Sequence, residues 1–317
     1  MNRLWERIWL LIRMTVCIMA GVTLLGLLGG NWSIWLELMT HFKLHMAAVA
    51  CLTLFASWTR KSHVWMAVSG FLVVVNFADV WPIYPQPAPP PPSEQEISLI
   101  ALNVLKPNKL HQRASDYLLK EDPDILILTE LTHVWCEGIE ELRDHYPHEV
   151  WFPQHGFFGV AILSKYPVVD WKHLELVDHT VTTLQADIDL GGDTVRVYGV
   201  HPPAPPRYQE MLWRDAHFVA FGELIPQSPY PVLMAGDLNS TSYSPKFKQL
   251  LKSTGLVDSR RGIGVQPSWP GKLAFMGITL DHCLHDPSIT IRDRGVGPPV
   301  GSDHLPLKIR FSMPKTE

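Results

Sequence analysis

Charged residues are scarce in this sequence. They make up 18% of its 317 residues, whereas apolar and aromatic residues make up 46%. An ordinary soluble domain carries about 25% charged residues. The apolar excess lies mainly before residue 85, so the sequence predicts a membrane-associated N-terminal segment followed by a soluble domain.

Cysteine and basic charge are sparse too. The four cysteines form no CxxC or Cys/His zinc spacing, which disfavours a thiolate metal site. A disulfide between Cys136 and Cys283 stays open as an alternative for an oxidising compartment. From Ser93 onward there are 21 Lys and Arg residues and 28 Asp and Glu residues, which gives a formal net charge of −7. This balance argues against DNA as the natural substrate, although a local basic patch remains compatible with it.

Three apolar runs precede the soluble part: Trp9–Gly29, Leu44–Trp58 and Val64–Ile83. The first and third reach the roughly 20 residues that a transmembrane helix needs, and the second is shorter. We therefore expect about three transmembrane helices in a membrane anchor over residues 1–83. A cleaved signal peptide is the alternative for the first run, but no small-x-small cleavage site is evident and two more apolar runs follow.

Basic residues predict the orientation of this anchor. Those near the first run or in the loop after the second are Arg3, Arg7, Arg13, Arg60 and Lys61, whereas the other loop has only Lys43. Basic loops stay in the cytoplasm, so three spans place everything after residue 83 on the other side. The charge pattern thus predicts a membrane protein whose soluble domain lies outside the cytoplasm. The orientation inverts if the second run does not cross.

A proline-rich linker follows at residues 84–96, with the sequence YPQPAPPPPSEQE. Stacked prolines favour a stiff extended spacer, and about 10 such residues at ~3.1 Å each keep the next domain within about 30 Å of the bilayer. Residues 97–317 then form the soluble domain. Short apolar runs typical of strands alternate there with amphipathic stretches typical of helices, which predicts two sheets packed face to face with helices outside. The run Val181–Leu190 alternates, so we expect one face of that strand to be solvated.

Polar residues stand where several of these expected strands end or a loop meets a strand. They are Asn103, Glu130, His201, Asp237, Asn239, Asp281, Asp303 and His304. Functional residues collect on loops held by a rigid scaffold, so the shared position predicts one cleft. Carboxylate and amide oxygens suit Mg²⁺ or Mn²⁺, and histidines transfer protons or donate to phosphate. Together they indicate in-line hydrolysis of a phosphate ester.

Each of these residues also has an ordinary structural explanation. Glu130 alone is typical of a surface charge at a strand end, and Asn103 alone is typical of a turn. Asp237 and Asn239 in AGDLN could form a plain Asx turn or a helix cap. If that stretch is extended, both side chains point the same way, and a tight turn at Gly236 lets the backbone approach a phosphate. The occurrence of all eight residues in this order favours a phosphoesterase site over these separate structural explanations.

The order of the motifs resembles the endonuclease/exonuclease/phosphatase superfamily over about residues 97–310. The motifs are LNV, ILTE, GVAILSKYPV, VHPPAP, AGDLNS, LDH and GSDHLPL. The superfamily includes pancreatic DNase, exonuclease III, neutral sphingomyelinases and inositol-polyphosphate 5-phosphatases. The resemblance implies a four-layer α/β/β/α sandwich, and with the N-terminal spans the chain looks like the membrane-anchored bacterial members.

The resemblance also implies a metal site. Glu130 would be the main Mg²⁺ ligand, with Asn103 close by and Asp303 assisting at the metal or through a hydrogen bond. Some nucleases of the superfamily carry an aspartate two residues after the first asparagine, where this chain has Leu105. Metal binding is therefore expected to depend more on Glu130 and Asp303.

The remaining residues receive catalytic roles from the same resemblance. His201 and Asn239 would hold the scissile phosphate, Asp237 would orient or deprotonate the attacking water, and Asp281 would orient His304. Whether Asp237 or His304 is the formal base stays open.

The superfamily does not fix the substrate. The anchor and the acidic domain favour a phosphodiester of a membrane lipid or another extracytoplasmic phosphodiester. The alternatives are a metal-dependent nuclease acting on DNA or RNA, a phosphatase of small monoesters, and an inactive binding module of the same fold. No protein partner is evident.

Overall fold

The computed structural model describes residues 2–30, 33–84, 95–177, 180–205 and 207–314. The chain divides into two compact units. One comprises Met1–Pro85 and Ser242–Lys248, and the other comprises Gln86–Thr241 and Gln249–Glu317. Most of the proline-rich linker expected at residues 84–96 lies outside the described residues.

Helices make up the described part of Met1–Pro85. They are α1 (Asn2–Gly29), α2 (Ile34–Thr40), α3 (Lys43–Thr59), α4 (His63–Ala78) and the 3-10 helix η1 (Trp81–Ile83). Their small shared core contains Val16, Met19, Ala50 and Leu72. Many other large apolar side chains of these helices are exposed, which is typical of helices that contact lipid rather than water.

One helix among the described residues is long and apolar enough to cross a membrane, over Arg3–Gly29 within α1. Helices α3 and α4 have 17 and 16 residues and fall short of that length. The third expected span, Val64–Ile83, is shortened because α4 ends at Ala78 and Pro82 lies in the separate helix η1. Among the described residues, one of the three expected spans thus passes this test of length and composition, and the three-span anchor stays a prediction.

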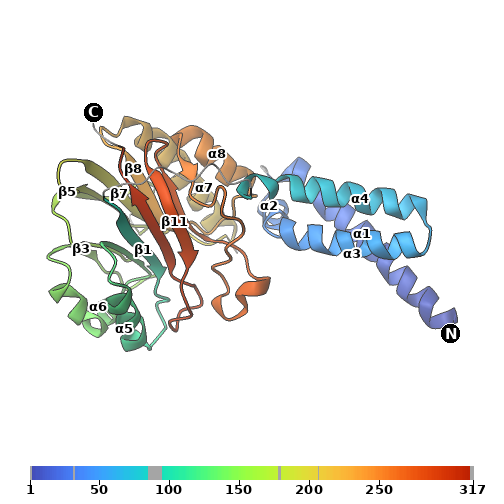
Figure 1. Ribbon diagram of the computed structural model, residues 1–317, viewed down its shortest axis with the longest axis horizontal. Coiled ribbons are helices and arrows are strands. Elements are labelled where there is room, and N and C mark those ends of the chain that lie inside the picture. The colour runs from blue at the N-terminus through green and yellow to red at the C-terminus, as the bar shows by residue number, and fades with distance from the viewer. Residues whose placement is uncertain (1, 31–32, 85–94, 178–179, 206, 315–317) are drawn as a thin grey trace. The chain divides into compact units, whose positions relative to one another are not determined.

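Two six-stranded mixed sheets form the described part of the second unit (Figure 1). The first has the order β11-β12-β1-β2-β4-β3, and the second has the order β5-β6-β7-β8-β10-β9. Each contains one parallel pair, β1 with β2 and β7 with β8. The strands of the first sheet are β1 (Ile97–Asn103), β2 (Ile125–Thr129), β3 (His148–Phe152), β4 (Val160–Ser164), β11 (Thr290–Val296) and β12 (Leu307–Ser312). Those of the second are β5 (Val168–Leu174), β6 (Thr183–Asp189), β7 (Thr194–Val200), β8 (Val232–Asp237), β9 (Val257–Asp258) and β10 (Asp281–His285).

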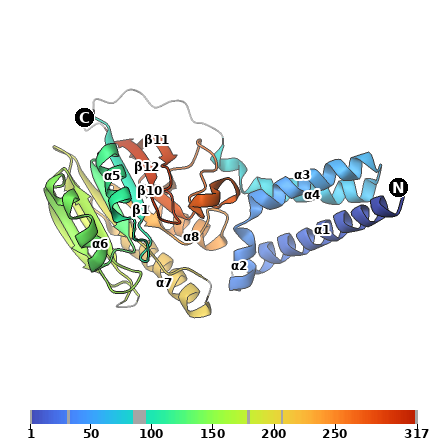
Figure 2. The ribbon, with the colours of Figure 1, turned by 90° about the horizontal axis from the view of Figure 1, so that it is seen from below.

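The two sheets pack face to face, and helices cover their outer faces (Figure 2). The core between the sheets includes Ile127 of β2 and Leu233 of β8. A second cluster joins the first sheet to α5 (His111–Glu121) and α6 (His133–Gly138). Helices α7 (Tyr208–Leu224) and α8 (Pro245–Thr254) follow in the second half of the chain. The expected four-layer sandwich is confirmed.

Strand β6 differs from the sequence prediction of one solvated face. Its first six residues are all buried. The polar side chains find partners on β7 instead of water. Asp187 accepts hydrogen bonds from Arg196 at 2.6 and 2.7 Å, and Gln185 accepts one from the Tyr198 hydroxyl at 3.3 Å. The alternation of polar and apolar residues therefore did not show whether the polar side chains of β6 contact water or hydrogen-bond to β7.

The strands β3, β5, β9 and β11 are hard to recognise in the sequence. All four lie at the ends of their sheets and are short or partly exposed, so they lack a strong apolar pattern. The cysteines Cys136 and Cys283 are both free. Cys283 lies in the core between the sheets, whereas Cys136 packs against the cluster under α5 and α6, so the disulfide considered above does not form.

Candidate active site

The sheet registers bring five of the predicted residues to the same edge of the sandwich. Asn103 ends β1 opposite Thr129 of β2, and Glu130 follows directly. Val200 of β7 pairs with Gly236 of β8, so His201 and Asp237 come next on neighbouring strands. Because β10 runs antiparallel to β8, Asp281 pairs directly with Asp237.

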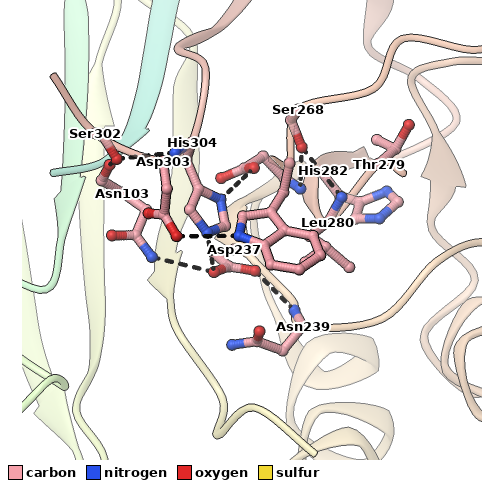
Figure 3. Close-up of polar contacts among 12 residues, drawn as sticks. Asn103, Asp237, Asn239, Ser268, Thr279, Leu280, His282, Ser302, Asp303 and His304 are labelled. Atoms are coloured by element: carbon pink, nitrogen blue, oxygen red, sulfur yellow. Dashed lines mark hydrogen bonds and ion pairs between the residues drawn. The ribbon is translucent and has the colours of Figure 1, made fainter. Parts of the chain in front are cut away.

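Asn103 connects the two sheets at this edge. Its Nδ2 atom donates to Glu130 Oε1 at 3.0 Å and to Asp237 Oδ2 at 3.1 Å, and Figure 3 shows the contact with Asp237. Its Oδ1 atom accepts from the Leu105 amide at 3.0 Å. All three polar side chains are at most 9% exposed, so this amide separates two carboxylates that would otherwise repel each other in a poorly hydrated site.

Glu130 occupies a backbone conformation that non-glycine residues rarely adopt, with φ of 59°. Its Oε2 atom accepts from the Lys106 amide at 2.9 Å. Leu105, just before Lys106, also has a positive φ, of 62°. Strained backbone of this kind persists where the surroundings over-determine it, and it collects at functional sites. The loop after β1 therefore fixes the position of the Glu130 carboxylate.

Two histidines flank the Asp237 carboxylate. His201 Nε2 lies 3.6 Å and His304 Nε2 lies 3.5 Å from Asp237 Oδ2. Each ring is oriented through its other nitrogen, His201 Nδ1 by the Phe157 carbonyl at 3.0 Å and His304 Nδ1 by Asp281 Oδ2 at 2.8 Å. The structure thus brings Asp237, His201, His304 and Asp281 into one cluster.

Burial and charge act in opposite directions on these groups. Burial favours the neutral form of His304, but Asp281 and Asp237 outweigh it and raise the pKa of that histidine to about 10. Burial also opposes protonation of His201, yet Asp237 and Glu130 raise its pKa. The Asp237 carboxyl is buried as well, and the two histidines still hold its pKa at about 2. The cluster accordingly places an ionised carboxylate beside two histidines whose protonated forms that carboxylate favours.

The AGDLN stretch is not extended, contrary to the prediction from its spacing. Asn239 has a φ of 48°, and its backbone amide donates to Asp237 Oδ1 at 2.9 Å. Its side-chain Nδ2 atom donates to the Pro202 carbonyl at 3.0 Å. Asn239 therefore approaches the carboxylate through its backbone, as Figure 3 shows, while its amide side chain adjoins the segment after His201.

Gly236 lies within β8 and does not form the tight turn that was expected. Its φ is 145°, and a Cβ atom there would stand 2.0 Å from the Val200 carbonyl oxygen. The glycine is thus required for close approach of β7 and β8, just before the strand reaches Asp237.

Asp303 is held by residues that the sequence analysis did not single out. Its Oδ2 atom accepts from Trp269 Nε1 at 3.0 Å, and its backbone carbonyl accepts from the Gly271 amide at 2.6 Å. Its Oδ1 atom is buried and has no hydrogen-bond partner among the described residues. The only sequence signal for Trp269 was an aromatic residue between Ser268 and Pro270 in a loop rich in turn residues.

The sequence analysis also did not identify two serines that support the site. Ser302 Oγ donates to the Asn103 carbonyl at 2.7 Å and accepts from the His304 amide at 3.0 Å. Ser268 Oγ accepts from the amides of Leu280 and Asp281, both at 3.1 Å. Both serines fix the backbone next to a predicted site residue, and Ser302 was visible in the GSDHLP motif.

The donor set fits a hard divalent cation. The residues expected to hold it, Asn103, Glu130 and Asp303, offer amide and carboxylate oxygens, and the orphaned Asp303 Oδ1 is an oxygen that a cation would satisfy. A different group has its ligand atoms closest together. Among the described residues, one ligand atom each of Asp237, Asp281 and His304 lie within 4.8 Å of one another. Their closeness follows from the contacts of the two carboxylates with the two nitrogens of the His304 ring, so we keep the first set as the predicted ligands.

A buried cluster of charged residues contacts β10 and the residues next to it. Asp258 accepts from Arg260 at 3.1 Å, and His282 Nδ1 lies 4.0 Å from the same carboxylate. Arg294 donates to the Asp281 backbone carbonyl at 3.3 Å. The two arginines and the burial itself lower the pKa of His282 to about 3, so this imidazole is neutral beside Asp281. The cluster anchors the backbone that carries the aspartate partner of His304.

Comparison with known proteins agrees with this geometry. The model of the Endonuclease/Exonuclease/phosphatase family matches residues 100–304. No curated protein sequence matches the chain significantly.

Solved structures give the same fold. A humanized D. rerio TDP2 with 14 mutations aligns at a TM-score of 0.58 and 16% identity over 69% of this chain and 99% of its own. An endonuclease/exonuclease/phosphatase from Beutenbergia cavernae aligns at 0.57 and 16% identity over 70% of this chain and 72% of its own. The beta toxin of Staphylococcus aureus aligns at 0.51 and 18% identity over 67% and 99%. Such identities show the fold alone. Because the family model covers well over half of the sequence, this chain belongs to the Endonuclease/Exonuclease/phosphatase family.

Proposed function

We propose that this protein is a divalent-metal-dependent phosphoesterase that hydrolyses a phosphodiester by in-line attack of water. The observation that carries the proposal is the Asp237 carboxylate, which lies within 3.6 Å of the Nε2 atoms of both His201 and His304 and accepts from Asn103. A buried carboxylate between two oriented imidazoles can accept a proton while the imidazoles stabilise phosphate charge.

Different side chains of the site bind the phosphate, accept the proton and orient the catalytic histidine. His201 and Asn239 bind the non-bridging oxygens of the phosphate. The oxygen of the water attacks phosphorus and the ester P–O bond breaks. The water proton passes to the Asp237–His304 pair, whose facing atoms are 3.5 Å apart, and the pair returns a proton to the oxygen of the leaving alcohol. Asp281 holds the His304 ring through Nδ1, which leaves Nε2 available to the reaction.

Glu130, Asn103 and Asp303 are the residues that would hold Mg²⁺ or Mn²⁺. When bound, the cation would neutralise phosphate charge and lower the pKa of a coordinated water. The hydrogen bonds from Asn103 and Lys106 to Glu130 orient the carboxylate for this role.

A phosphodiester of a membrane lipid, or another extracytoplasmic phosphodiester, is the favoured substrate because the chain carries the apolar helix α1 and an acidic catalytic domain. A nuclease activity is the second candidate, since D. rerio TDP2, which has the same fold, was solved with a single-strand DNA product. A panel of phospholipid vesicles, plasmid DNA, RNA and sugar phosphates, assayed with Mg²⁺ and with EDTA, separates the two. If the protein hydrolyses none of these substrates and does not hydrolyse bis-p-nitrophenyl phosphate, the inactive binding module becomes the favoured alternative.

We further propose that the anchor lies in a bacterial inner membrane and that the catalytic domain faces the periplasm. The basis is the excess of basic residues before the first apolar run and after the second. A periplasm-specific reporter fused after Glu96 should be active, and a cytoplasm-specific one inactive. The reverse pattern would overturn the orientation.

A further inference from the structure

A short loop next to the site exposes apolar side chains. It is the 3-10 segment η4 (Gly271–Met276), in which Leu273 is 52% and Phe275 is 82% exposed. The one charged residue of this segment, Lys272, is exposed as well. A phenylalanine this exposed beside another exposed apolar residue is unusual on a soluble surface and marks an interaction site.

The loop is tied directly to Asp303. Its first residue, Gly271, donates its amide to the Asp303 carbonyl, and Trp269 two residues earlier donates its indole N–H to the Asp303 carboxylate. Figure 3 shows this carboxylate near Asn103 and His304. Whatever surface binds Leu273 and Phe275 is therefore brought to the rim of the candidate active site.

A lipid bilayer fits this loop better than a soluble partner does. Aromatic and aliphatic side chains next to one lysine are typical of segments that insert at the membrane interface, where the apolar groups enter the acyl region and the amine stays among the headgroups. The same chain carries α1, which is long and apolar enough to cross a membrane. The domain as a whole is acidic, so attraction to anionic lipids does not favour its contact with the bilayer surface, whereas apolar insertion does.

We infer that η4 inserts Leu273 and Phe275 into the bilayer surface and so presents the active site to phosphodiesters in lipid headgroups. This inference rests on the proposed function for its substrate, whereas insertion itself is measurable without catalysis.

The test uses the full chain reconstituted in phosphatidylcholine/phosphatidylglycerol vesicles. An NBD fluorophore is attached at Phe275→Cys in a background that carries Cys17→Ser, Cys51→Ser and Cys136→Ser, with the buried Cys283 retained. The matched control is Trp171→Cys, because Trp171 is an aromatic residue of β5 that is 52% exposed. Doxyl-labelled lipids should quench NBD at position 275 and leave it unaffected at position 171.

Two results would overturn the inference. One is equal quenching at both positions. The other is a label at 275 that iodide cannot reach and doxyl lipids do not quench, which would mean that a protein surface, such as a second copy of this chain, covers the loop.

An activity comparison links the loop to the substrate. Phe275→Ser should lower the ratio of turnover on vesicle phospholipid to turnover on soluble bis-p-nitrophenyl phosphate by about 10-fold, whereas Trp171→Ser should not change it. An unchanged ratio for Phe275→Ser would show that the loop does not deliver a lipid substrate. If the unaltered protein hydrolyses neither compound, the proposed function fails, and the fluorescence result still decides insertion.

Discussion

His304 Nδ1 lies 2.8 Å from Asp281 Oδ2, and the two residues come from β10 and from the loop before β12, in different sheets. This bond fixes the tautomer of the imidazole and directs Nε2 toward Asp237. The pair therefore couples the orientation of one catalytic group to the packing of the two halves of the sandwich.

Replacing Asp281 by asparagine should reduce turnover of bis-p-nitrophenyl phosphate by about 10²-fold or more, because the neutral amide no longer raises the pKa of His304 and holds its Nδ1 atom less firmly. Circular dichroism should show an unchanged fold. Asp144→Asn, an exposed substitution in the same domain, is the control. Turnover within a factor of about two of the control would mean that His304 does not depend on Asp281.

Much of this site followed from the order of strands and polar residues along the sequence. Asn103, Glu130, His201 and Asp237 each follow or end an apolar strand, and parallel neighbours in a sheet bring such ends together. The pairing of Asp281 with Asp237 was not accessible in the same way, since it depends on which distant strand joins β8.

Other features depend on backbone conformation or on single loop contacts. The left-handed conformation of Asn239 reversed the expected direction of its side chain. The contact of Trp269 with Asp303 joins two loops that no periodic pattern relates. The third apolar run was drawn too long because apolar composition continues past Ala78, where α4 ends.

Metal dependence should be sensitive to Glu130→Gln. The substitution keeps the size of the side chain but removes its negative charge, so the Mg²⁺ concentration for half-maximal activity should rise by about 10- to 100-fold. Mg²⁺ titration of bis-p-nitrophenyl phosphate hydrolysis measures this shift, with the exposed substitution Glu140→Gln as the control. Equal activation curves for both variants would place the metal elsewhere.

The buried cluster behind β10 predicts a specific acid sensitivity. Burial disfavours the charged form of Asp258, but Arg260, His282 and Arg294 outweigh it, and they hold the pKa of this carboxyl below its ordinary value of 3.8. A carboxyl with a depressed folded pKa contributes stability above its unfolded pKa and loses it as the pH falls toward the folded value. The contribution is therefore present at neutral pH and declines below about pH 4.

Asp258→Asn should remove this dependence. At pH 7 the variant should be destabilised by about 3–5 kcal/mol, because two buried guanidinium groups lose their anion. Below about pH 4 its stability should fall less steeply than that of the unaltered chain. Thermal unfolding of the full chain in detergent between pH 3 and pH 7 measures both effects. Parallel pH profiles for the two proteins would contradict the assignment.

Asp237 and His304 should act on one transition state. Their facing atoms are 3.5 Å apart, and both lie in the network that includes Asn103 and Asp281. We expect Asp237→Asn and His304→Ala each to reduce kcat by at least about 10²-fold, the usual effect of losing a positioned proton-transfer group or transition-state donor.

The double variant Asp237→Asn/His304→Ala should be scarcely slower than the slower single variant. Once one member is lost, the proton has no path through the pair, so removal of the other costs little more. Single-turnover rates on bis-p-nitrophenyl phosphate at saturating Mg²⁺ measure the coupling, with Trp171→Ser as a control for general damage. If the double variant instead loses the full product of the two single effects, the residues act independently, and the Asp237–His304 pair is not the unit that accepts the proton.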